Sequence, residues 1–506
     1  MDGAPRPLVG IAGTGLMGRG IAQVAAQAGF DTLLYDTRAG TAAAARDAIV
    51  GQLQRLAEKG KLTAAAAMEA GARLKPVASL ADFAACGVVI EAIVEDLPAK
   101  CELFRALERV VGPTCVLATN TSSLSVTAIA AACARPERVG GFHFFSPVPL
   151  MKIVEVIEGV RSDPAVAERL TEIARAFGHV PVRAKDTPGF LVNHAGRAYG
   201  TEALRIVSEG IADFRAVDEV LREGAGFRMG PFELLDLTGL DVSQPVMESI
   251  YHQFHEEPRF RPSPLLLQRK LGGLLGRKSG RGFYAYEDGV KQVPAAAPPP
   301  AAPREAAVWV SRTAAAARPA LEALVAKLGA RVDGADRPTK DAICLLSPWD
   351  SDATAAALAE GVDPRRAIAI DGAFGLATRR TLMTTPVTDP AVRDAAHGLL
   401  ASDGVPVTVI HDSPGFIAPR VVAQVVNVAC DIAQQRIATP ADIDRAVTLG
   451  LGYRQGPLAM GDALGADRVL ALLEGLLEFY GDPRYRPSPW LTRRARLGVP
   501  LATPES

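Results

Sequence analysis

The stretch "GIAGTGLMGRG", residues 10–20, decides the fold of the chain. It joins an apolar run, typical of a buried strand, to the helical sequence "IAQVAAQAGF". Inside it, Gly13, Gly15 and Gly18 form a Gly-x-Gly-x-x-Gly pattern, and Asp36 ends the next apolar run, "DTLLYD". A glycine pattern in this strand–turn–helix setting, followed by an acidic residue about 20 positions on, is typical of dinucleotide-binding domains.

Each glycine of the pattern has its own role in holding a cofactor. Gly13 allows the tight turn, Gly15 lets the backbone approach a pyrophosphate, and Gly18 lets the helix pack against the strand. Leu16 and Met17 belong to the same turn and are counted with the cofactor-binding residues. The carboxylate that ends the second strand can accept hydrogen bonds from a ribose diol and repels a 2′-phosphate, so the expected cofactor is NAD. The alternative is an ordinary glycine turn with an unrelated aspartate.

Strands and helices alternate from the glycine turn to about residue 185. "CGVVIEAI", "CVLATNTSS" and "RVGGFHFF" are typical strands, separated by helices such as "PAKCELFRALERVV". This alternation predicts an α/β Rossmann-type architecture, a doubly wound parallel sheet. An Ala-rich stretch at about 40–72 is expected to be helical. After "DTPGF" the apolar spacing becomes helical, and "GFLVNHAGRAYGTEALRIVSEG" predicts one long amphipathic helix.

The second half of the chain repeats part of the first. "DTPGF" at 186–190 returns as "DSPGF" at 412–416, and "RMGPFELLDLTGLD" at 228–241 returns as "RQGPLAMGDALGAD" at 454–467. Both pairs share an offset of 226 residues (412 minus 186, 454 minus 228), which indicates an internal duplication. The expected domains are 1–185 (NAD-binding), 186–290 (helical), 291–304 (Pro/Ala linker), 305–411 (degenerate α/β remnant) and 412–506 (second helical domain).

Two ionisable residues stand in apolar, strand-like runs within "HFFSPVPLMKIVEVIEG", residues 143–159. Buried ionisable groups are costly unless they are paired, and two strands joined by a short connection can bring His143 and Glu155 side by side. A carboxylate beside an imidazole favours the imidazolium and fixes the ring's orientation. We therefore expect His143 to be the general base for a hydroxyl proton in oxidation and the general acid in reduction. The alternative is a core histidine beside an unrelated surface glutamate.

Polar residues also follow a predicted strand at "ATNTSSLS". Asn120, Thr121, Ser122 and Ser123 come just past its carboxyl end, where ligands of open α/β sheets bind. Their hydroxyls can hydrogen-bond a substrate oxygen, although at least one is expected to cap the helix that follows. Asn193, early in the expected long helix, is a candidate second donor, and a plain helix-start asparagine is the alternative.

The offset of the repeat tests which copy does chemistry. Applied to His143, Glu155 and Asn193, it gives Ala369, Thr381 and Pro419. The second copy also has no glycine pattern at its start. We therefore expect a degenerate copy that buries the helical face of the first.

In this order, the motifs resemble the 3-hydroxyacyl-CoA dehydrogenase family. The resemblance spans residues 8–286 and is carried by "GTGLMGRGIAQVAAQAGFDTLLYD", "EAIVEDLPAK", "TNTSSL", "HFFSPVPLMKIVEVI", "DTPGFLVNH", "GPFELLDLTGLD" and "RKSGRGFYAY". It implies NAD-dependent oxidation of a (3S)-3-hydroxyacyl-CoA to the 3-oxoacyl-CoA, so that an acyl-CoA thioester is the partner. The duplicated tail resembles the bacterial phenylacetate-degradation branch, whose substrate is 3-hydroxyadipyl-CoA. Fatty-acid degradation with 3-hydroxybutyryl-CoA stays open.

The resemblance also implies roles for individual residues. His143 would be the acid/base, Glu155 its partner, and Ser122 and Asn193 the groups that bind the reacting oxygen and the substrate. The residues that it places near NAD are Glu95, Lys100 and Lys278, and the residue that it places on coenzyme A is Lys59. Without the resemblance, these four charges would pass as solvated surface.

One position departs from the family pattern. Ser146 stands where the family usually has an asparagine on the nicotinamide side of the site. Because serine is shorter, cofactor placement is expected to differ slightly, and Ser146 is kept among the cofactor-binding residues.

The net charge, the apolar runs and the cysteine count of the chain limit the partners that it can have. The formal net charge of -1 leaves no basic footprint for nucleic acid or an anionic membrane. No apolar run reaches the roughly 18 residues that span a bilayer. The 6 cysteines are scattered without Cys-x-x-Cys spacing, which is typical of reduced thiols in a cytoplasmic protein and of no metal site. The repeated helical domains could pair within the chain, and a homodimer stays open.

Two alternative functions remain at this stage. One is a dehydrogenase of a free 3-hydroxy acid that needs no coenzyme A. The other is a catalytically silent NAD-binding protein, a fate that the decayed second copy illustrates.

Overall fold

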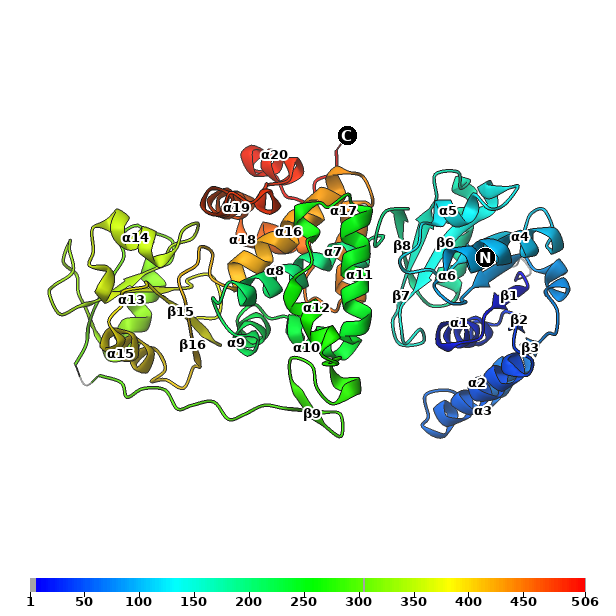
Figure 1. Cartoon of the computed structure of the whole chain (residues 1–506), viewed down its shortest axis with the longest axis horizontal. Helices are drawn as coiled ribbons and strands as arrows, with labels where there is room; N and C mark the ends of the chain where they lie inside the picture. Colours follow the sequence, from blue (N-terminus) through cyan, green and yellow to red (C-terminus); the bar gives the residue numbers. More distant parts are fainter. Residues whose placement is uncertain (1–5, 304, 506) are drawn as a thin grey trace. The chain divides into compact units, whose positions relative to one another are not determined.

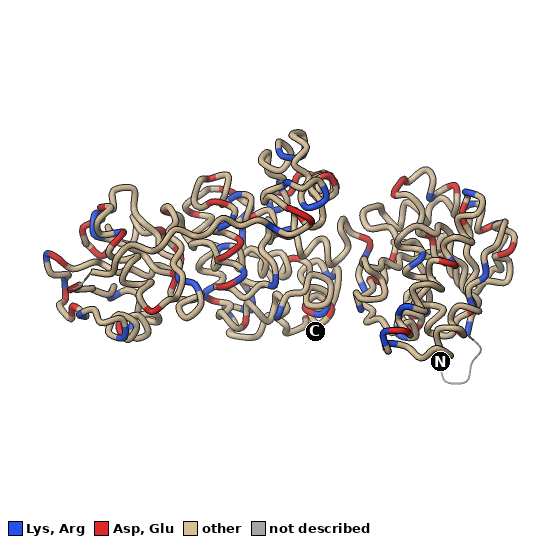
Figure 2. Tube along the Cα trace, turned by 90° about the horizontal axis from the view of Figure 1, so that it is seen from below, with Lys and Arg blue, Asp and Glu red and all other residues tan. Residues whose placement is uncertain are grey.

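The computed structural model describes residues 6–303 and 305–505 (Figure 1). The chain divides into two compact units. The first runs to residue 194 and also includes 435–452, and the second comprises 195–434 with the residues from 453 onward. Acidic and basic residues are interspersed along both units (Figure 2), and their numbers over the whole sequence are nearly equal, 56 Asp and Glu against 55 Lys and Arg.

The first unit is built on an eight-stranded sheet with the order β3-β2-β1-β4-β5-β6-β7-β8. Its strands are β1 (Val9–Ala12), β2 (Thr32–Tyr35), β3 (Leu74–Pro76), β4 (Val88–Glu91), β5 (Val116–Thr119), β6 (Val139–Phe144), β7 (Ile153–Glu158) and β8 (Val180–Lys185). The Rossmann-type fold class is confirmed. The first six strands are parallel, but β7 pairs antiparallel with β6, because the short connection between them cannot form a crossover.

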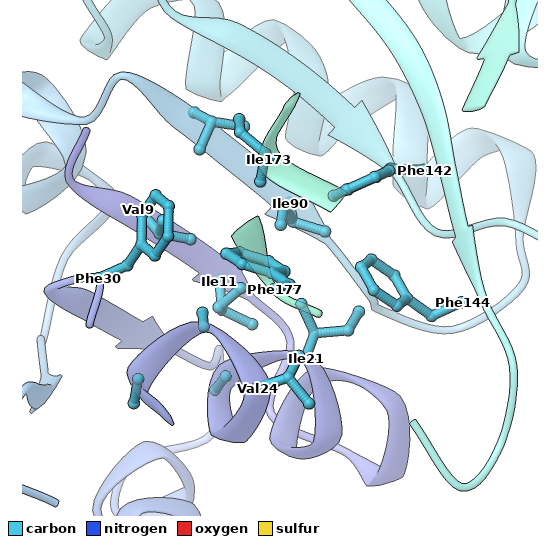
Figure 3. Packing of buried hydrophobic residues seen from close by; sticks show 14 of the residues in the cluster. Val9, Ile11, Ile21, Val24, Phe30, Ile90, Phe142, Phe144, Ile173 and Phe177 are labelled. Atoms are coloured by element: carbon cyan, nitrogen blue, oxygen red, sulfur yellow. The ribbon is translucent and has the colours of Figure 1, made fainter. Parts of the chain in front are cut away.

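Helices cover the sheet and bury its apolar side chains. They are α1 (Leu16–Gln27), α2 (Thr41–Glu58), α3 (Ala64–Ala72), α4 (Leu97–Val110), α5 (Val126–Ala130), α6 (Pro164–Ala176) and α7 (Val192–Ala195), with the short η1 (Leu80–Ala85) and η2 (Pro136–Arg138). Figure 3 shows the core that α1 closes against the strands, where Ile21 and Val24 face Ile11 and the ring of Phe144. Burying each such side chain contributes about 1.5–3 kcal/mol.

Two of the expected helices are interrupted. The stretch at about 40–72 forms α2 and α3, because Thr63 accepts a hydrogen bond from the backbone of Ala66 and starts a new helix. The helix predicted from residue 189 is divided at Gly196 into α7 and α8 (Arg197–Ser208). Amphipathic spacing predicted helical conformation correctly here, but it gave no sign of the breaks.

The second unit contains helices from both copies of the repeat. Those of the first copy are α8, α9 (Phe214–Glu219), α10 (Pro231–Thr238), α11 (Leu240–Gln253) and α12 (Pro264–Leu271), with the turns η3 (Val220–Gly224), η4 (Pro258–Phe260) and η5 (Arg277–Ser279). Those of the second copy are α16 (Ala418–Gln434), α18 (Pro457–Leu464), α19 (Ala466–Tyr480) and α20 (Pro489–Leu497), with η7 (Pro483–Tyr485). A hairpin of β9 (Ala285–Glu287) and β10 (Val290–Gln292) extends two residues into the range predicted as linker.

A six-stranded sheet with the order β12-β11-β13-β14-β15-β16 also belongs to the second unit. Its elements are β11 (Ala307–Val310), α13 (Arg318–Lys327), β12 (Arg331–Val332), β13 (Ile343–Leu346), α14 (Ala353–Glu360), η6 (Pro364–Arg366), β14 (Ala367–Ile370), β15 (Arg380–Thr384), α15 (Pro390–Leu400) and β16 (Val407–Ile410). As at β6 and β7, the pair β14 and β15 is antiparallel. This sheet is the α/β remnant that the duplication predicted.

One helix of the second copy joins the other unit. Residues 435–452, which include α17 (Pro440–Gly450), group with the first unit, where α17 contacts β7 and β8. The backbone N–H of Lys185 donates to the carbonyl of Ile437 at 2.9 Å. The expected second helical domain, 412–506, is therefore interrupted, and its other boundaries stay predictions.

Strand pairing corrects the correspondence between the two copies. A constant offset aligns His143 with Ala369, but β14 begins directly after η6, as β6 begins directly after η2. Counted from these starts, Asp371 takes the place of His143. The N–H of Asp371 donates to the carbonyl of Thr381 at 3.0 Å, and Thr381 corresponds to Glu155, the residue opposite His143. The alignment with Ala369 is wrong because the connection between these strands is shorter in the second copy.

Buried charges join the two sets of helices within the second unit. Arg420 on α16 is fully buried and donates to Glu202 of α8 at 2.6 Å and to the hydroxyl of Tyr485 at 2.8 Å. Glu209, at the end of α8, accepts from the same guanidinium at 3.0 Å. The contact between α8 and α16 therefore has an ion-paired polar centre inside an apolar interface, in which Glu202 Oε1 is hydrogen-bonded and Oε2 has no hydrogen-bond partner among the described residues.

No helix in the described part of the chain is long and apolar enough to cross a membrane.

Candidate active site

The glycine turn lies between β1 and α1, at the carboxyl end of the sheet. Gly13 has a φ of 96°, and a side chain on it would meet the carbonyl oxygen of Ala92 at 2.6 Å. A Cβ on Gly18 would lie 1.9 Å from the carbonyl oxygen of Gly13, whereas one on Gly15 would meet nothing within 4 Å. Packing within the chain therefore explains Gly13 and Gly18. The open space over Gly15 leaves room for a ligand to approach the protein backbone closely.

The helix that follows the turn can hold an anion. No side chain caps the N-terminus of α1, and its first turn has no acidic residue. Its free N–H groups and its dipole therefore favour a phosphate, so the residues present fit a dinucleotide. Leu16, whose side chain is 67% exposed, and Met17 form this first turn, as predicted from the sequence.

Asp36 lies at the end of β2, opposite the turn. Its Oδ2 accepts hydrogen bonds from the N–H and the hydroxyl of Thr14 at 3.0 and 2.9 Å, and Oδ1 accepts from the N–H of Arg38. Burial disfavours its charged form, but these donors hold the pKa of Asp36 below its usual value. The group is thus an anion beside the turn, suited to a ribose diol and unsuited to a 2′-phosphate.

Lys100 is buried between two carboxylates and is no surface charge. Its Nζ lies 2.6 Å from Glu91 Oε1 and 3.4 Å from Glu95 Oε2. Glu91, at the end of β4, also accepts from the hydroxyl of Thr119 at 2.7 Å. Sequence reasoning missed Glu91, although an acidic residue at the end of an apolar strand is the signal that could have found it. In this arrangement Lys100 orients Glu95.

Glu95 in turn shapes the turn after β5. Its Oε1 accepts from the hydroxyl of Thr121 at 2.7 Å and from the backbone N–H groups of Ser122 and Ser123 at 2.9 and 3.0 Å. Burial opposes ionisation, but the Thr121 hydroxyl and Lys100 keep the pKa of Glu95 below its usual value. The predicted polar cluster is therefore an ordered turn. Ser122 Oγ, 3.3 Å from the same oxygen, is only weakly engaged and stays able to bind a ligand.

His143 and Glu155 lie directly opposite one another in the antiparallel pair of β6 and β7. His143 Nδ1 is 2.5 Å from Glu155 Oε2, and both side chains are buried. Glu155 Oε1 accepts from the backbone N–H groups of Leu191 and Val192 at 2.9 and 2.8 Å. The contact between His143 and Glu155 that the sequence predicted is present. Through its other oxygen, Glu155 also holds the backbone directly before Asn193.

The strand ends bring these groups to one edge of the sheet. Asn120 accepts from the backbone N–H of Phe144 at 2.8 Å, so the turn after β5 is fastened to the strand that carries His143. The rings of Phe145 and Phe190 lie 4.5 and 5.9 Å from the imidazole, measured between centroids. His143 therefore has a dry, fixed setting with one ring nitrogen committed to Glu155.

A basic cavity of about 530 Å³ lies beside the glycine turn, between α1, α2 and the loop after β6. Arg19, Arg55 and Lys152 line it, without any acidic side chain, and Ser146 lies on its wall. Sequence reasoning missed these three cations, because they come from three separate elements. Ser146 is thus placed between the cavity and the strand that bears His143.

The two remaining predicted residues are exposed. Lys59, just past the end of α2, is exposed and does not line the basic cavity. Lys278 belongs to the second unit, where its Nζ lies 2.5 Å from Asp241 Oδ1. Their contacts with coenzyme A and NAD stay predictions.

Family models match both parts of this architecture. The model for the NAD-binding domain of 3-hydroxyacyl-CoA dehydrogenase matches residues 8–187. The model for the C-terminal domain matches residues 189–286 and again residues 415–501. The chain belongs to the 3-hydroxyacyl-CoA dehydrogenase family. Within this family its cofactor is NAD, and the double match confirms that the C-terminal domain is repeated.

Relatives of known name support the same family. The chain is 40% identical to the 3-hydroxyadipyl-CoA dehydrogenase of Escherichia coli K12 over 490 residues, 97% of each chain. It is 44% identical to a probable 3-hydroxybutyryl-CoA dehydrogenase of Deinococcus radiodurans over 277 residues, which are 55% of this chain and 99% of that relative. A solved structure described as 3-hydroxybutyryl-CoA dehydrogenase from Escherichia coli K12 has a TM-score of 0.84 at 37% identity, covering 98% of this chain and 99% of that one. The chain is an NAD-dependent 3-hydroxyacyl-CoA dehydrogenase.

Proposed function

We propose that His143 and Glu155 form the acid/base pair that takes the proton of the 3-hydroxyl when an acyl-CoA thioester is oxidised. The observation that carries this proposal is the 2.5 Å contact between His143 Nδ1 and Glu155 Oε2 at the edge of the sheet that bears the glycine turn. Because Nδ1 is committed to the carboxylate, Nε2 is the nitrogen left to take the proton from the hydroxyl. NAD, when bound, supplies the hydride acceptor.

Glu155 would stabilise the positive charge that His143 gains. A charged partner at hydrogen-bond distance favours the imidazolium, and the bond fixes the ring with Nε2 toward the substrate. The neighbouring rings of Phe145 and Phe190 exclude water, which strengthens this interaction. General base catalysis of this kind contributes about 10²–10⁴-fold to the rate.

Ser122 and Asn193 would position the reacting oxygen. Ser122 lies on the turn that Glu95 orders, and Asn193 follows the two N–H groups bound by Glu155. The backbone of Ser122 and the backbone just before Asn193 are therefore each held by a carboxylate. A hydroxyl and a side-chain amide can donate to the oxygen that becomes a carbonyl in the product.

The basic cavity supports a coenzyme A thioester over a free acid. Arg19, Arg55 and Lys152 present three cations at one opening, and coenzyme A carries several phosphate charges. A free 3-hydroxy acid has only one carboxylate and would leave this cavity without a function. The names of the relatives, which specify acyl-CoA substrates, agree with this.

The acyl group that we propose is 3-hydroxyadipyl, with 3-hydroxybutyryl as the second candidate. A relative that aligns with 97% of the chain, including the repeat, is named for the first substrate. The solved structure that covers nearly the whole chain is named for the second. We further infer that pairing of α8 and α16 inside one chain replaces pairing between chains, which the Arg420–Glu202 contact supports.

Substrate kinetics test the proposal. Reduction of NAD would be followed by absorbance with 3-hydroxyadipyl-CoA, (S)-3-hydroxybutyryl-CoA and free 3-hydroxybutyrate. We expect kcat/KM for the thioesters to exceed that of the free acid by about 10³-fold, because binding energy from coenzyme A is lost with the acid. Equal rates on acid and thioester would contradict the assignment to acyl-CoA. A higher kcat/KM on the butyryl than on the adipyl thioester would contradict the finer choice.

A further inference from the structure

The second copy keeps a cavity at the place where Rossmann-type units bind ligands. It has a volume of about 680 Å³ and lies at the carboxyl ends of β11, β13 and β14, wholly within the second unit. Its walls are the turn after β11 (313–317), the loop after β13 (347–351) and residues 371–373 after β14. This is the edge of the second sheet that corresponds to the edge bearing the candidate active site of the first.

The cavity is unsuited to a dinucleotide. The turn after β11 lacks the glycines, and the carboxylate of Glu360 already occupies it. Glu360 accepts from the hydroxyl of Thr313 at 2.8 Å, from the N–H of Arg312 at 3.2 Å and from the hydroxyl of Ser311. An anion at this position repels a pyrophosphate, so another class of ligand must be considered.

Asp371, the residue in the place of His143, lines this cavity with an unsatisfied oxygen. Its side chain is 2% exposed, and Oδ1 accepts from the N–H groups of Ala373 and Phe374 at 2.9 and 3.0 Å. Oδ2 is buried and has no hydrogen-bond partner among the described residues. Burial raises the pKa of Asp371 to about 7. A buried acceptor without a donor is costly, which is the condition that a donating ligand would relieve.

The rest of the lining is acidic and apolar, and it includes the hydroxyl side chains of Thr313, Ser347 and Ser351. Asp350 and Glu360 join Asp371, against the single cation Arg468. The guanidinium of Arg468 lies 4.0 Å from the centroid of the Trp349 ring, and its charge also acts on Asp371, where it lowers the pKa that burial raises. The apolar wall consists of Ala314–Ala317, Ala355, Ala356, Ala359 and Phe416.

We propose that this cavity binds a small amphipathic amine, whose ammonium group donates to Asp371 while its apolar body lies on the alanine wall. An ammonium supplies both the missing donor and the charge that three lining carboxylates favour. An alcohol supplies only the donor, and a carboxylate supplies neither. The site is separate from the candidate active site, so its occupation does not require the dehydrogenase chemistry.

Three probes that differ only in their head group test the proposal on the full chain. They are 3-phenylpropylamine, 3-phenylpropanol and 3-phenylpropionate, titrated by calorimetry at pH 8, where the Asp371 carboxyl is mostly ionised. We expect the amine to bind with a Kd of about 1 mM, the range for a ligand of this size, and at least about tenfold more tightly than the carboxylate. Equal affinity for the three head groups, or no binding of the amine at 10 mM, would overturn the proposal.

Asp371→Asn removes the acceptor without changing the shape of the side chain. Its amide oxygen can still accept from Ala373 and Phe374, while an NH2 group replaces the unsatisfied Oδ2. We expect at least a tenfold loss of amine affinity, with unchanged NAD-dependent turnover and melting temperature. Ala356→Phe, which fills the cavity from α14 and leaves Asp371 intact, should abolish amine binding too. Wild-type amine affinity in either folded variant would show that the probe binds elsewhere, which contradicts the proposal.

Discussion

At the scale of single residues, Glu155 connects the chemistry to the backbone. One oxygen faces His143 at 2.5 Å, and the other accepts the N–H groups of Leu191 and Val192. A carboxylate with both oxygens engaged has one orientation, so the imidazole that it holds has one as well. Asn193, the next residue along, is positioned by the same contact.

The carboxylate of Asp36 should set the choice between NAD and NADP. In Asp36→Ala we expect KM for NAD to rise about tenfold, because an ionised acceptor of the ribose diol is lost. We expect the ratio of kcat/KM for NAD to kcat/KM for NADP to fall by at least the same factor. Initial rates at varied cofactor and fixed thioester measure both. Asp31→Ala, at an exposed position before β2, is the matched control. An unchanged KM for NAD would exclude Asp36 from the cofactor site.

Residue pairs were the most predictable part of the site. The cost of burying His143 and Glu155 indicated that they meet but left an unpaired core histidine open, and the family resemblance decided between the two; the glycine pattern was enough to predict the turn. The equivalence of His143 and Asp371 could not be predicted. It depends on the length of chain that joins the two paired residues, which is shorter in the second copy than in the first, and the neighbouring sequence motifs do not show this difference. Without the family resemblance, Lys100 would have passed as a surface charge, because its partner Glu91 stands in an otherwise apolar run; its place near NAD stays a prediction.

At the scale of elements, an ion-pair group fastens α4 to the strand ends. Lys100 on α4 is 1% exposed and joins Glu91 at the end of β4 to Glu95, which orders the turn after β5. Lys100 and the two glutamates form one connected group, in which each charged side chain has a partner of opposite charge. Loss of the cation would leave the fully buried carboxylate of Glu91 without a charged partner, next to the 37% exposed carboxylate of Glu95.

Lys100→Met should destabilise the first unit strongly. We expect the free energy of unfolding to fall by about 3–5 kcal/mol, since removal of one partner leaves a buried charge uncompensated. The double variant Glu91→Gln/Lys100→Met should recover part of that loss. Urea unfolding followed by circular dichroism measures both, with Lys61→Met, at an exposed position, as the control. A loss under 1 kcal/mol would contradict the buried ion pair.

The basic cavity between α1 and α2 should bind the coenzyme A part of the substrate. In Arg55→Gln we expect KM for the acyl-CoA to rise about tenfold, since a charge-assisted contact contributes roughly 1.5–3 kcal/mol, with kcat little changed. The N-acetylcysteamine thioester, which lacks the phosphates, should show no such difference. Lys59→Gln is the comparison, because Lys59 lies near the same helix end outside the cavity. A larger effect of Lys59→Gln than of Arg55→Gln would place coenzyme A elsewhere.

Element types were predictable, but their breaks and partners were less so. Hydrophobic spacing predicted helical conformation over 192–208, but the break at Gly196 leaves the apolar spacing unchanged and could not be predicted from it. The grouping of α17 with the first unit could not be predicted either. Amphipathic spacing indicates that a helix has a buried face, but it does not identify the element against which that face packs.

At the scale of the whole molecule, duplication has produced one chain with two sheets and two sets of helices. The constant offset between short motifs was enough to predict this, and the C-terminal family model matches both copies. α16 is buried along nearly its whole length, and Arg420 on it contacts α8 of the first copy. The repeat is thus part of the folded core of the second unit.

Arg420→Met tests how much that junction contributes to stability. Because Glu202 would remain buried with Arg484 at 3.4 Å as its one charged partner among the described residues, beside the hydroxyl of Tyr485 at 2.8 Å, we expect the free energy of unfolding of the second unit to fall by about 3–5 kcal/mol. In the double variant Glu202→Gln/Arg420→Met, the total loss should be smaller than the sum of the two single losses. Calorimetric melting of the four proteins completes the cycle. Additive losses would show that the pair is not coupled.

The most direct test of the account is the turnover of His143→Gln. NADH formation from (S)-3-hydroxybutyryl-CoA would be measured together with the Kd of NAD, and Glu155→Gln would be run beside it. The account predicts that kcat falls by at least about 10²-fold in both variants while NAD affinity stays within about twofold, because the pair acts on the hydroxyl proton and not on cofactor binding. A kcat near the wild-type value in His143→Gln would contradict it.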